Sequence, residues 1–182
     1  MPRTRNELER DAKVAEILEA AERRLREGGY EALSVAGIAR ELGLAQNAIY
    51  WYFPSKDHLF VAALGRMLQE IAARKPRGKE AGPTERILWF TDQFQVLSDL
   101  RGAMNERARD SHVVAEFVEE LDALLSRMLA NALRDHVRAE ELPIAVETFR
   151  ATVEGTFVKG LDRRARRKVL TFALERLIGR ET

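Results

Sequence analysis

Two amides and two large aromatic side chains share one face of a short helical stretch near residue 50. On a helical wheel Ile49 turns toward neighbouring helices, whereas Asn47 points almost directly away. Gln46 and Tyr50 lie on one flank of this outward position, and Trp51 lies on the other. An amide can bond adenine through two hydrogen bonds in the major groove, and an aromatic side chain with a polar tip can lie along a sugar-phosphate backbone. This face therefore has the chemistry of a surface that reads double-stranded DNA.

A second short helix must hold the reading stretch in place. Ser34 is a good N-cap, and Ile38 and Leu42 follow at helical spacing to give that helix an apolar side. Gly43 then interrupts the pattern, as a glycine in the left-handed conformation does at a helix end. Two helices joined by a glycine-containing turn are typical of a helix-turn-helix, whose second helix enters the major groove. The same short pattern also occurs as a plain helical hairpin in other α proteins.

The sequence offers little for catalysis or metal binding. His58, His112 and His136 are far apart, and none has a suitable metal ligand three or four residues away. A glycine-rich phosphate loop and a nucleophile elbow are both missing. The chain has no cysteine, which excludes disulfides and thiolate metal sites. We therefore expect a protein that is not an enzyme and that needs neither a cofactor nor a metal ion.

The composition suits a helical protein with a sizeable core. The chain has 182 residues, of which 46% are hydrophobic and 32% charged. Its net charge is +1, and residues 1–56 hold nine basic and nine acidic side chains, so a general basic character cannot explain DNA binding. No signal-peptide core and no apolar run long enough for a membrane helix is present, so we expect a cytoplasmic protein without a membrane partner.

Apolar periodicity predicts an all-α fold of about nine helices. Ser55 is expected to cap the helix that follows the reading stretch and continues to about Arg74, and the segment 75–83 to be a linker. The other predicted helices are Glu9–Glu27, Thr84–Leu100, Ala103–Asp110, Val113–Arg138, Pro143–Gly160 and one from residue 162 or 163 to Ile178. The basic run 163–168 is expected to be a solvated helix face rather than a second nucleic-acid patch.

Several spaced features around the helix-turn-helix agree with one known family. They are the Gly-Gly-Tyr at 28–30, the Leu-Ser-Val at 33–35, the Ile-Tyr-Trp-Tyr-Phe-Pro-Ser-Lys-Asp at 49–57 and the Leu-Phe at 59–60. Over about residues 12–64 the chain closely resembles the DNA-binding domain of the tetracycline-repressor (TetR) family. Beyond that region it agrees with the family only in helix pattern and length.

The resemblance implies a DNA-binding domain over residues 1–56 and a ligand-binding and dimerisation domain over residues 57–182. It also implies a homodimer built through the last two helices and a palindromic DNA operator. A small hydrophobic effector is expected to release the repressor by changing the spacing of its two reading heads. Three alternatives stay open: a ligand-independent dimeric DNA-binding protein, an activator, and a helical adaptor or enzyme that merely contains the hairpin.

Three sets of site residues follow. In the DNA-binding set, Gln46 and Asn47 are expected to read bases, and Ser34, Tyr50, Tyr52 and Lys56 to hold phosphates, with Trp51 on the same surface. The predicted effector pocket is lined by Met67, Trp89, Gln93, Phe94, Met104, Phe117 and Phe149. The predicted dimer interface consists of Phe149, Val153, Phe157, Leu170, Leu174 and Leu177.

Overall fold

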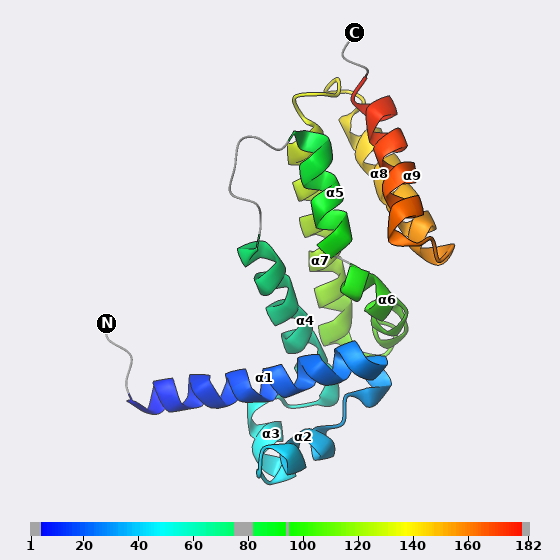
Figure 1. Cartoon of the computed structure of the whole chain (residues 1–182). Coiled ribbons are helices and arrows are strands. Elements are labelled where there is room, and N and C mark those ends of the chain that lie inside the picture. The colour runs from blue at the N-terminus through cyan, green and yellow to red at the C-terminus, as the bar shows by residue number, and fades with distance from the viewer. Residues whose placement is uncertain (1–4, 75–81, 94, 180–182) are drawn as a thin grey trace. The chain divides into compact units, whose positions relative to one another are not determined.

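The computed structural model describes residues 5–74, 82–93 and 95–179, without the side chains of Asn6, Pro83, Gln95 and Val96. Within these residues the chain forms nine α-helices and no strand (Figure 1). They are α1 (Arg5–Ala32), α2 (Val35–Glu41), α3 (Gln46–Tyr52), α4 (Lys56–Ala73), α5 (Pro83–Gln93), α6 (Gln95–Arg107), α7 (His112–Leu133), α8 (Leu142–Val158) and α9 (Arg163–Leu177). The all-α prediction is confirmed. No helix in the described ranges is both long and apolar enough to cross a membrane.

Contacts divide the chain into two compact units. The first contains α1 to α4 together with residues 99–118, and the second contains α5, the residues up to Ser98, and the chain from Glu119 onward. The helices α6 and α7 therefore each run from one unit into the other. The division predicted after residue 56 falls inside the first unit instead, at the start of α4, because α4 packs along α1.

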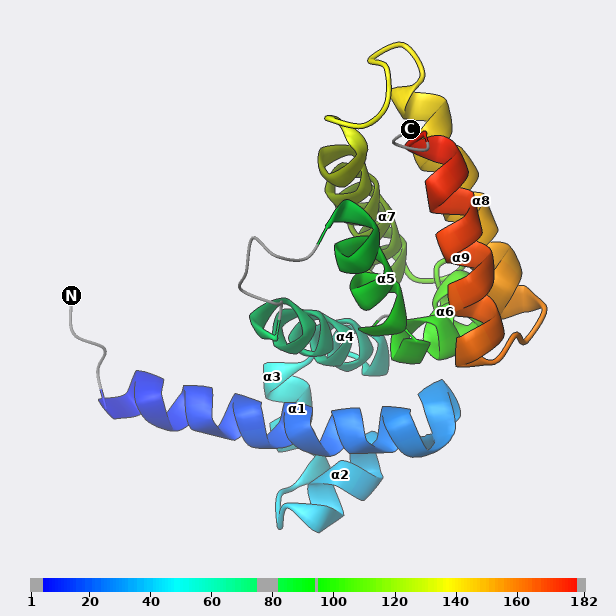
Figure 2. The same ribbon diagram turned by 45° about the horizontal axis from the view of Figure 1, so that its top comes forward.

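In the first unit, α4 lies on one side of α1, and α2 and α3 lie on the other (Figures 1 and 2). The apolar side chains of α1 and α4 recur every three or four residues, so they form continuous stripes that face each other. The fully buried members are Ile17, Ala20 and Ala21 from α1, and Leu59, Phe60, Ala63 and Leu64 from α4. This α1–α4 core supports the two short helices, since helices of seven residues are not stable alone.

Two glycines set the ends of the helices that carry the helix-turn-helix. Gly29 has φ 66° and Gly43 has φ 64°, both in the left-handed region that side chains with a Cβ rarely adopt. The expected stop of the first helix at Gly28-Gly29 and the expected left-handed turn at Gly43 are therefore confirmed. The helical assignment of α1 nevertheless runs on past the glycines to Ala32, because a short turn follows the kink.

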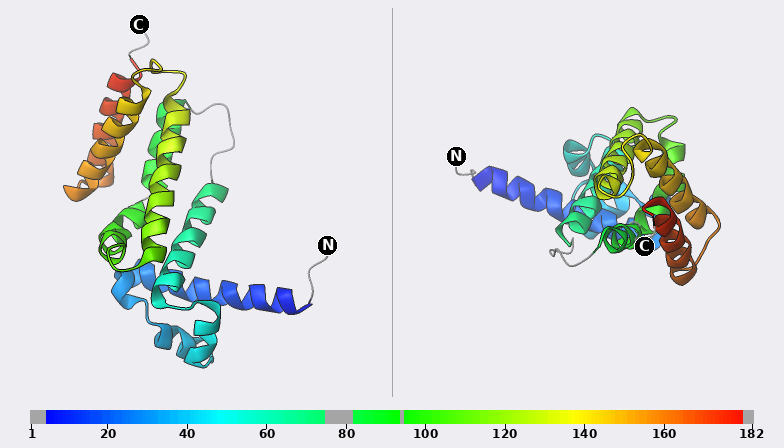
Figure 3. Two further views of the ribbon diagram at one scale, coloured as in Figure 1. Left: turned by 180° about the vertical axis from the view of Figure 1, so that it is seen from behind. Right: turned by 90° about the horizontal axis from the view of Figure 1, so that it is seen from above.

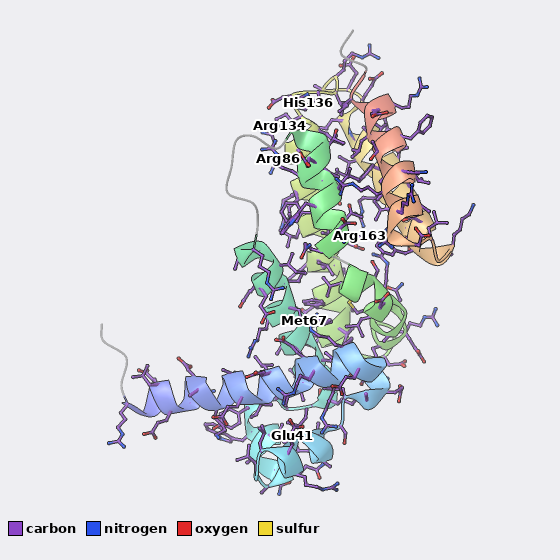
Figure 4. The ribbon with its side chains drawn as sticks, in the orientation of Figure 1. Glu41, Met67, Arg86, Arg134, His136 and Arg163 are labelled. Carbon is purple, nitrogen blue, oxygen red and sulfur yellow. The ribbon has the colours of Figure 1, made fainter. Side chains whose placement is uncertain are left out.

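A third glycine lets α2 approach α1 closely. A Cβ on Gly37 would lie only 3.0 Å from Nη1 of Arg24, so the guanidinium group rests directly against the glycine. Arg24 also forms an ion pair with Glu41 at 3.0 Å, and Arg23 contacts the same carboxylate. Figure 4 labels Glu41, which is the last residue of α2. The contacts fix the orientation of α2, on which α3 packs.

The second unit has a core of its own, formed mainly by α5, α7, α8 and α9. Its buried residues are Ile87, Leu88, Leu129, Leu133, Ala145, Val146, Phe149, Leu170 and Leu174. The helices α8 and α9 lie side by side (Figure 3). The helix α5 also contacts α9. The predicted bounds of α8 and α9 are close to the observed ones.

One expectation about the second half of the chain is wrong. The sequence pattern predicts a break between a helix that ends at Leu100 and one that begins at Ala103, but α6 runs without interruption from Gln95 to Arg107, with Gly102 inside it. Phe94, between α5 and α6, lies outside the described residues, as does most of the predicted linker 75–83. The basic run 163–168 is a solvated helix face as expected at Arg163, Arg164, Arg167 and Lys168, whereas Arg166 is only 5% exposed.

The left-handed turn gives a stability prediction. Replacing Gly43 by Ala should lower the free energy of unfolding by about 1–2 kcal/mol, because a Cβ is strained at positive φ. Replacing Gly65 by Ala is the matched control: this glycine lies inside α4 with no atom near the added Cβ, so the change should raise stability by about 0.5–1 kcal/mol. Urea denaturation measures both. Equal effects of the two substitutions would contradict the assigned backbone conformation.

Candidate DNA-binding surface

The outward face of α3 is exposed as its spacing predicts. Gln46 and Asn47 are exposed, Tyr50 is 39% exposed and Trp51 is 67% exposed. Ile49 is fully buried and anchors the helix to its neighbours. Polar amides and aromatic rings thus stand in solvent on a helix whose other side is fixed. Contact of these side chains with DNA remains a prediction.

An arginine from α1 extends this face. The Trp51 and Tyr52 rings meet edge to face at 4.8 Å, and the guanidinium carbon of Arg10 lies 5.1 Å from the centroid of the Trp51 ring. This cation lies beside the aromatic side chains of the reading helix, where it can attract a phosphate. The sequence did not single out Arg10, because the pairing joins residues 41 positions apart and leaves no periodic signal.

Two serines cap the helices that flank α3. Ser34 Oγ accepts a hydrogen bond from the backbone N–H of Gly37 at 3.1 Å, and Ser55 Oγ accepts one from that of His58 at 3.2 Å. Both predicted caps are confirmed. The hydroxyl proton of Ser34 remains able to donate to a phosphate, which is the role predicted for it.

Lys56 opens α4 and is held by an aromatic ring. Its Nζ lies 3.9 Å from the centroid of the Tyr30 ring, a cation–π contact. A lysine in the first turn opposes the helix dipole, and the π face of Tyr30 offsets part of that cost. The ammonium group and the free N–H groups of the α4 N-terminus thereby form a positively charged corner beside α3 that is suited to an anion.

A buried carboxylate ties this corner to the end of α6. Asp57 Oδ1 accepts hydrogen bonds from the Tyr30 hydroxyl at 2.6 Å and from Arg107 Nε at 3.3 Å, and its Oδ2 accepts one from Arg107 Nη2 at 3.0 Å. The Tyr30 ring also packs edge-on against Phe60, with centroids 4.9 Å apart. We call Tyr30, Asp57 and Arg107 the Asp57 cluster. No sequence pattern indicates this cluster, because its members lie far apart along the chain.

Electrostatics in the Asp57 cluster favours the ionised carboxylate. Burial alone would raise the pKa of Asp57, but hydrogen bonds from Arg107, Tyr30 and Ser111 outweigh it and hold the pKa at about 2. Burial and the hydrogen bond to Asp57 raise the pKa of Tyr30 to about 12. The cluster is therefore a charged, fully formed network over the physiological range.

The residues of the predicted effector pocket are divided between the two units. Met67, Met104 and Phe117 belong to the first unit, and Trp89, Gln93 and Phe149 belong to the second. Met67, Met104 and Phe149 are almost completely buried (Figure 4 labels Met67). Phe94 lies outside the described residues. The pocket remains a prediction for this set.

The predicted dimer residues are mostly part of the core of the second unit. Phe149, Leu170 and Leu174 are at most 2% exposed, because they face α5 and α7 within the same chain, and they have no surface to offer a partner. Val153, Phe157 and Leu177 are partly buried. The apolar side chains that α8 and α9 do expose are Ile144, Val158, Val169 and Phe172.

The Asp57 cluster gives a pH-dependent prediction. Asp57 is half ionised at about pH 2 in the folded state and at about pH 3.8 in the unfolded state, so its contribution is complete above about pH 5 and is lost as the pH falls through 2. Asp57→Asn should lower the free energy of unfolding at pH 7 by about 1–2 kcal/mol, and most of the difference from wild type should be lost by about pH 2.

The exposed Asp135 provides the control for this experiment, since Asp135→Asn removes the same charge without touching the cluster. Denaturant titrations at several pH values measure the difference. A cost of Asp57→Asn that is the same at pH 7 and at pH 2.5 would show that the ionised form is not what stabilises the protein.

Comparison with known proteins places this geometry in a family. The model of bacterial regulatory proteins of the tetR family matches residues 17–63, which contain α2, α3 and the start of α4. The HTH-type transcriptional repressor KstR of Mycolicibacterium smegmatis is 29% identical over 176 residues, covering 91% of this chain and 86% of that protein. The HTH-type transcriptional repressor AcnR of Corynebacterium diphtheriae is 30% identical over 155 residues, covering 80% of this chain and 79% of the repressor.

The similarity extends to the whole fold. A putative transcriptional regulator from Saccharomonospora viridis, solved in complex with choline, superimposes with a TM-score of 0.73 over 91% of this chain and 96% of that structure. Its sequence identity is 18%, so this likeness concerns the fold alone. The resemblance drawn from the helix-turn-helix motif is thereby confirmed: the chain belongs to the tetR family of bacterial regulatory proteins.

Proposed function

We propose that this regulator is a dimeric repressor that reads a palindromic operator through α3 and leaves it when a small molecule binds. The observation that carries the proposal is the exposed face of α3, where two amides and two aromatic side chains lie in solvent while the buried Ile49 anchors the opposite side of the helix. The similarity to KstR and AcnR, both named as repressors, supports repression rather than activation.

On DNA, the side chains of this surface divide into two roles. Gln46 and Asn47 lie at the first turn of α3, the part of a recognition helix that reaches base edges, and an amide suits adenine there. Tyr50, Tyr52, Lys56 and the Ser34 hydroxyl hold phosphates on either side, and Arg10 adds a further cation next to Trp51. In this division, the phosphate-binding side chains at the edge of the surface supply most of the affinity for DNA, and the two amides at its centre supply the preference for particular bases.

The dimer is proposed to form through an exposed stripe on α8 and another on α9. On α8 the stripe repeats at intervals of four and three residues and consists of Ile144, Thr148, Ala151, Gly155 and Val158. On α9 the same spacing relates Ala165, Val169, Phe172 and Arg176. Small residues on α8 permit close approach of a partner helix, and Val169 and Phe172 supply apolar area. Phe149, Leu170 and Leu174 of the predicted dimer set are buried within the chain and are not part of this stripe.

Control by an effector needs a connection to the reading head, and the Asp57 cluster provides one. Arg107 is the last residue of α6, and Asp57 lies in the first turn of α4, next to Lys56. A ligand that displaces the end of α6 would pull on the corner that holds the DNA backbone. Its effect is limited by the difference between its affinities for the DNA-bound and released states. The choline complex of the S. viridis protein supports a small-molecule site in this fold.

Substitutions on α3 and α4 separate the two kinds of DNA contact. Gln46→Ala or Asn47→Ala should cost about 1–3 kcal/mol of binding free energy on the preferred site and little on random DNA. Lys56→Ala should weaken binding to both DNAs alike and reduce the salt slope by roughly 1. Fluorescence anisotropy at several salt concentrations measures these effects.

Gln69→Ala is the matched control, since Gln69 is an exposed amide on α4 outside this surface and should bind as wild type. A changed sequence preference in Lys56→Ala, or equal losses on both DNAs in Asn47→Ala, would show that the roles are wrongly assigned.

A charge on the exposed stripe tests the dimer. Phe172→Glu should convert the dimer to a monomer, because a carboxylate would be buried against the partner, and should weaken operator binding at least tenfold with α3 unchanged. Arg164→Glu, which places a carboxylate on the same helix away from the stripe, should remain dimeric. Sedimentation velocity distinguishes the two. A dimeric Phe172→Glu variant, or a wild type that is a monomer, would refute this interface.

A further inference from the structure

A pocket with a volume of about 390 Å³ lies in the second unit between the end of α5 and the start of α9. Its lining comes from short segments that are distant in sequence: Asp92, Gln93, Leu161, Asp162, Arg163 and Arg166. The predicted effector set shares only Gln93 with it. The other members of that set are apolar, whereas five of the six residues that line this pocket are polar or charged.

Arg166 is the unusual member of the lining, because it is a buried cation without a charged partner. It is 5% exposed, and its Nε is buried and has no hydrogen-bond partner. Its Nη1 donates one long hydrogen bond of 3.5 Å to the Leu161 carbonyl, and its guanidinium carbon lies 4.5 Å from the centroid of the Phe157 ring. Among the described residues, no carboxylate lies within ion-pair distance of it. A buried charge of this kind is costly unless an anion compensates it.

The nearby carboxylates are already engaged. Asp92 Oδ2 accepts hydrogen bonds from Arg163 Nη2 at 2.9 Å and Nε at 3.2 Å, and it lies 3.5 Å from Nη1 of Arg167. Asp162 caps α9, where its Oδ1 accepts from the N–H of Ala165 at 2.8 Å. Figure 4 labels Arg163 at the start of α9. The group in this pocket that still lacks a partner is therefore a positively charged hydrogen-bond donor, the guanidinium of Arg166.

We infer that this pocket binds a small carboxylate-bearing molecule, with the carboxylate on Arg166. The guanidinium edge offers a planar fork that a carboxylate fits with two hydrogen bonds, while the Phe157 ring holds the guanidinium in place. Gln93 can orient a second polar group of the ligand, and the volume suffices for a molecule of several non-hydrogen atoms. This site does not depend on the proposed repression or on the pocket predicted from the sequence.

Isothermal titration of the full chain with benzoate and with succinate tests the inference, with benzamide as the neutral analogue of benzoate. At least one of the two carboxylates should bind at one site per chain, and benzamide should bind at least tenfold more weakly. Arg166→Gln should reduce carboxylate binding at least tenfold. Arg164→Gln removes the same charge from an exposed position of α9 and should bind as wild type.

Circular dichroism shows whether Arg166→Gln keeps its fold. If it unfolds, Arg166→Lys decides in its place: it keeps a buried cation but loses the fork, so binding should again fall at least tenfold. On the wild-type chain, the Nε–H resonance of Arg166 should shift when the carboxylate is added. No binding of either carboxylate at 10 mM, on the order of the weakest specific affinities, would overturn the inference. Equal binding by the Arg166 and Arg164 variants would overturn it as well.

Discussion

The carboxylate of Asp57 joins three parts of the first unit that are not neighbours in sequence. It binds the Tyr30 hydroxyl, which follows the kink at the end of α1, and the guanidinium of Arg107, which ends α6. The Tyr30 ring in turn carries Lys56 on its face and Phe60 at its edge. The position of the α4 N-terminus, and with it the charged corner beside α3, thus depends on one ionised side chain. A carboxylate that is mostly buried keeps its charge here only because its donors outweigh the cost of burial.

A few contacts with neighbouring residues likewise set the position of the reading helix α3. It is only seven residues long, so its orientation comes from neighbours rather than from its own hydrogen bonds. Ile49 fixes its inner side, the left-handed Gly43 fixes the turn before it, and Arg24 resting on Gly37 fixes the helix against which it packs. What stays free is the polar and aromatic outer face. A helix with an anchored inner side and an exposed outer face can present a few side chains to a DNA groove in one fixed register.

Local signals carried most of what could be predicted. The Ser34 and Ser55 caps and the glycine turns depend on a few adjacent residues, so they could be found in the sequence, as could the outward face of α3. The Asp57 cluster could not, since Asp57 and Arg107 are fifty residues apart. The dimer interface is hard to predict for a different reason. α9 has two apolar sides, one with Leu170 and Leu174 and another with Val169 and Phe172, and periodicity alone cannot tell which side the chain itself covers.

The central claim is that α3 reads a defined DNA sequence as part of a symmetric dimer. Selection of bound fragments from a random pool of double-stranded DNA, followed by sequencing, tests it most directly. We expect an enriched palindrome whose two half-sites are related by two-fold symmetry, with adenines at the positions that Gln46 and Asn47 face. Recovery of fragments with no common sequence, under salt conditions that suppress non-specific binding, would contradict it.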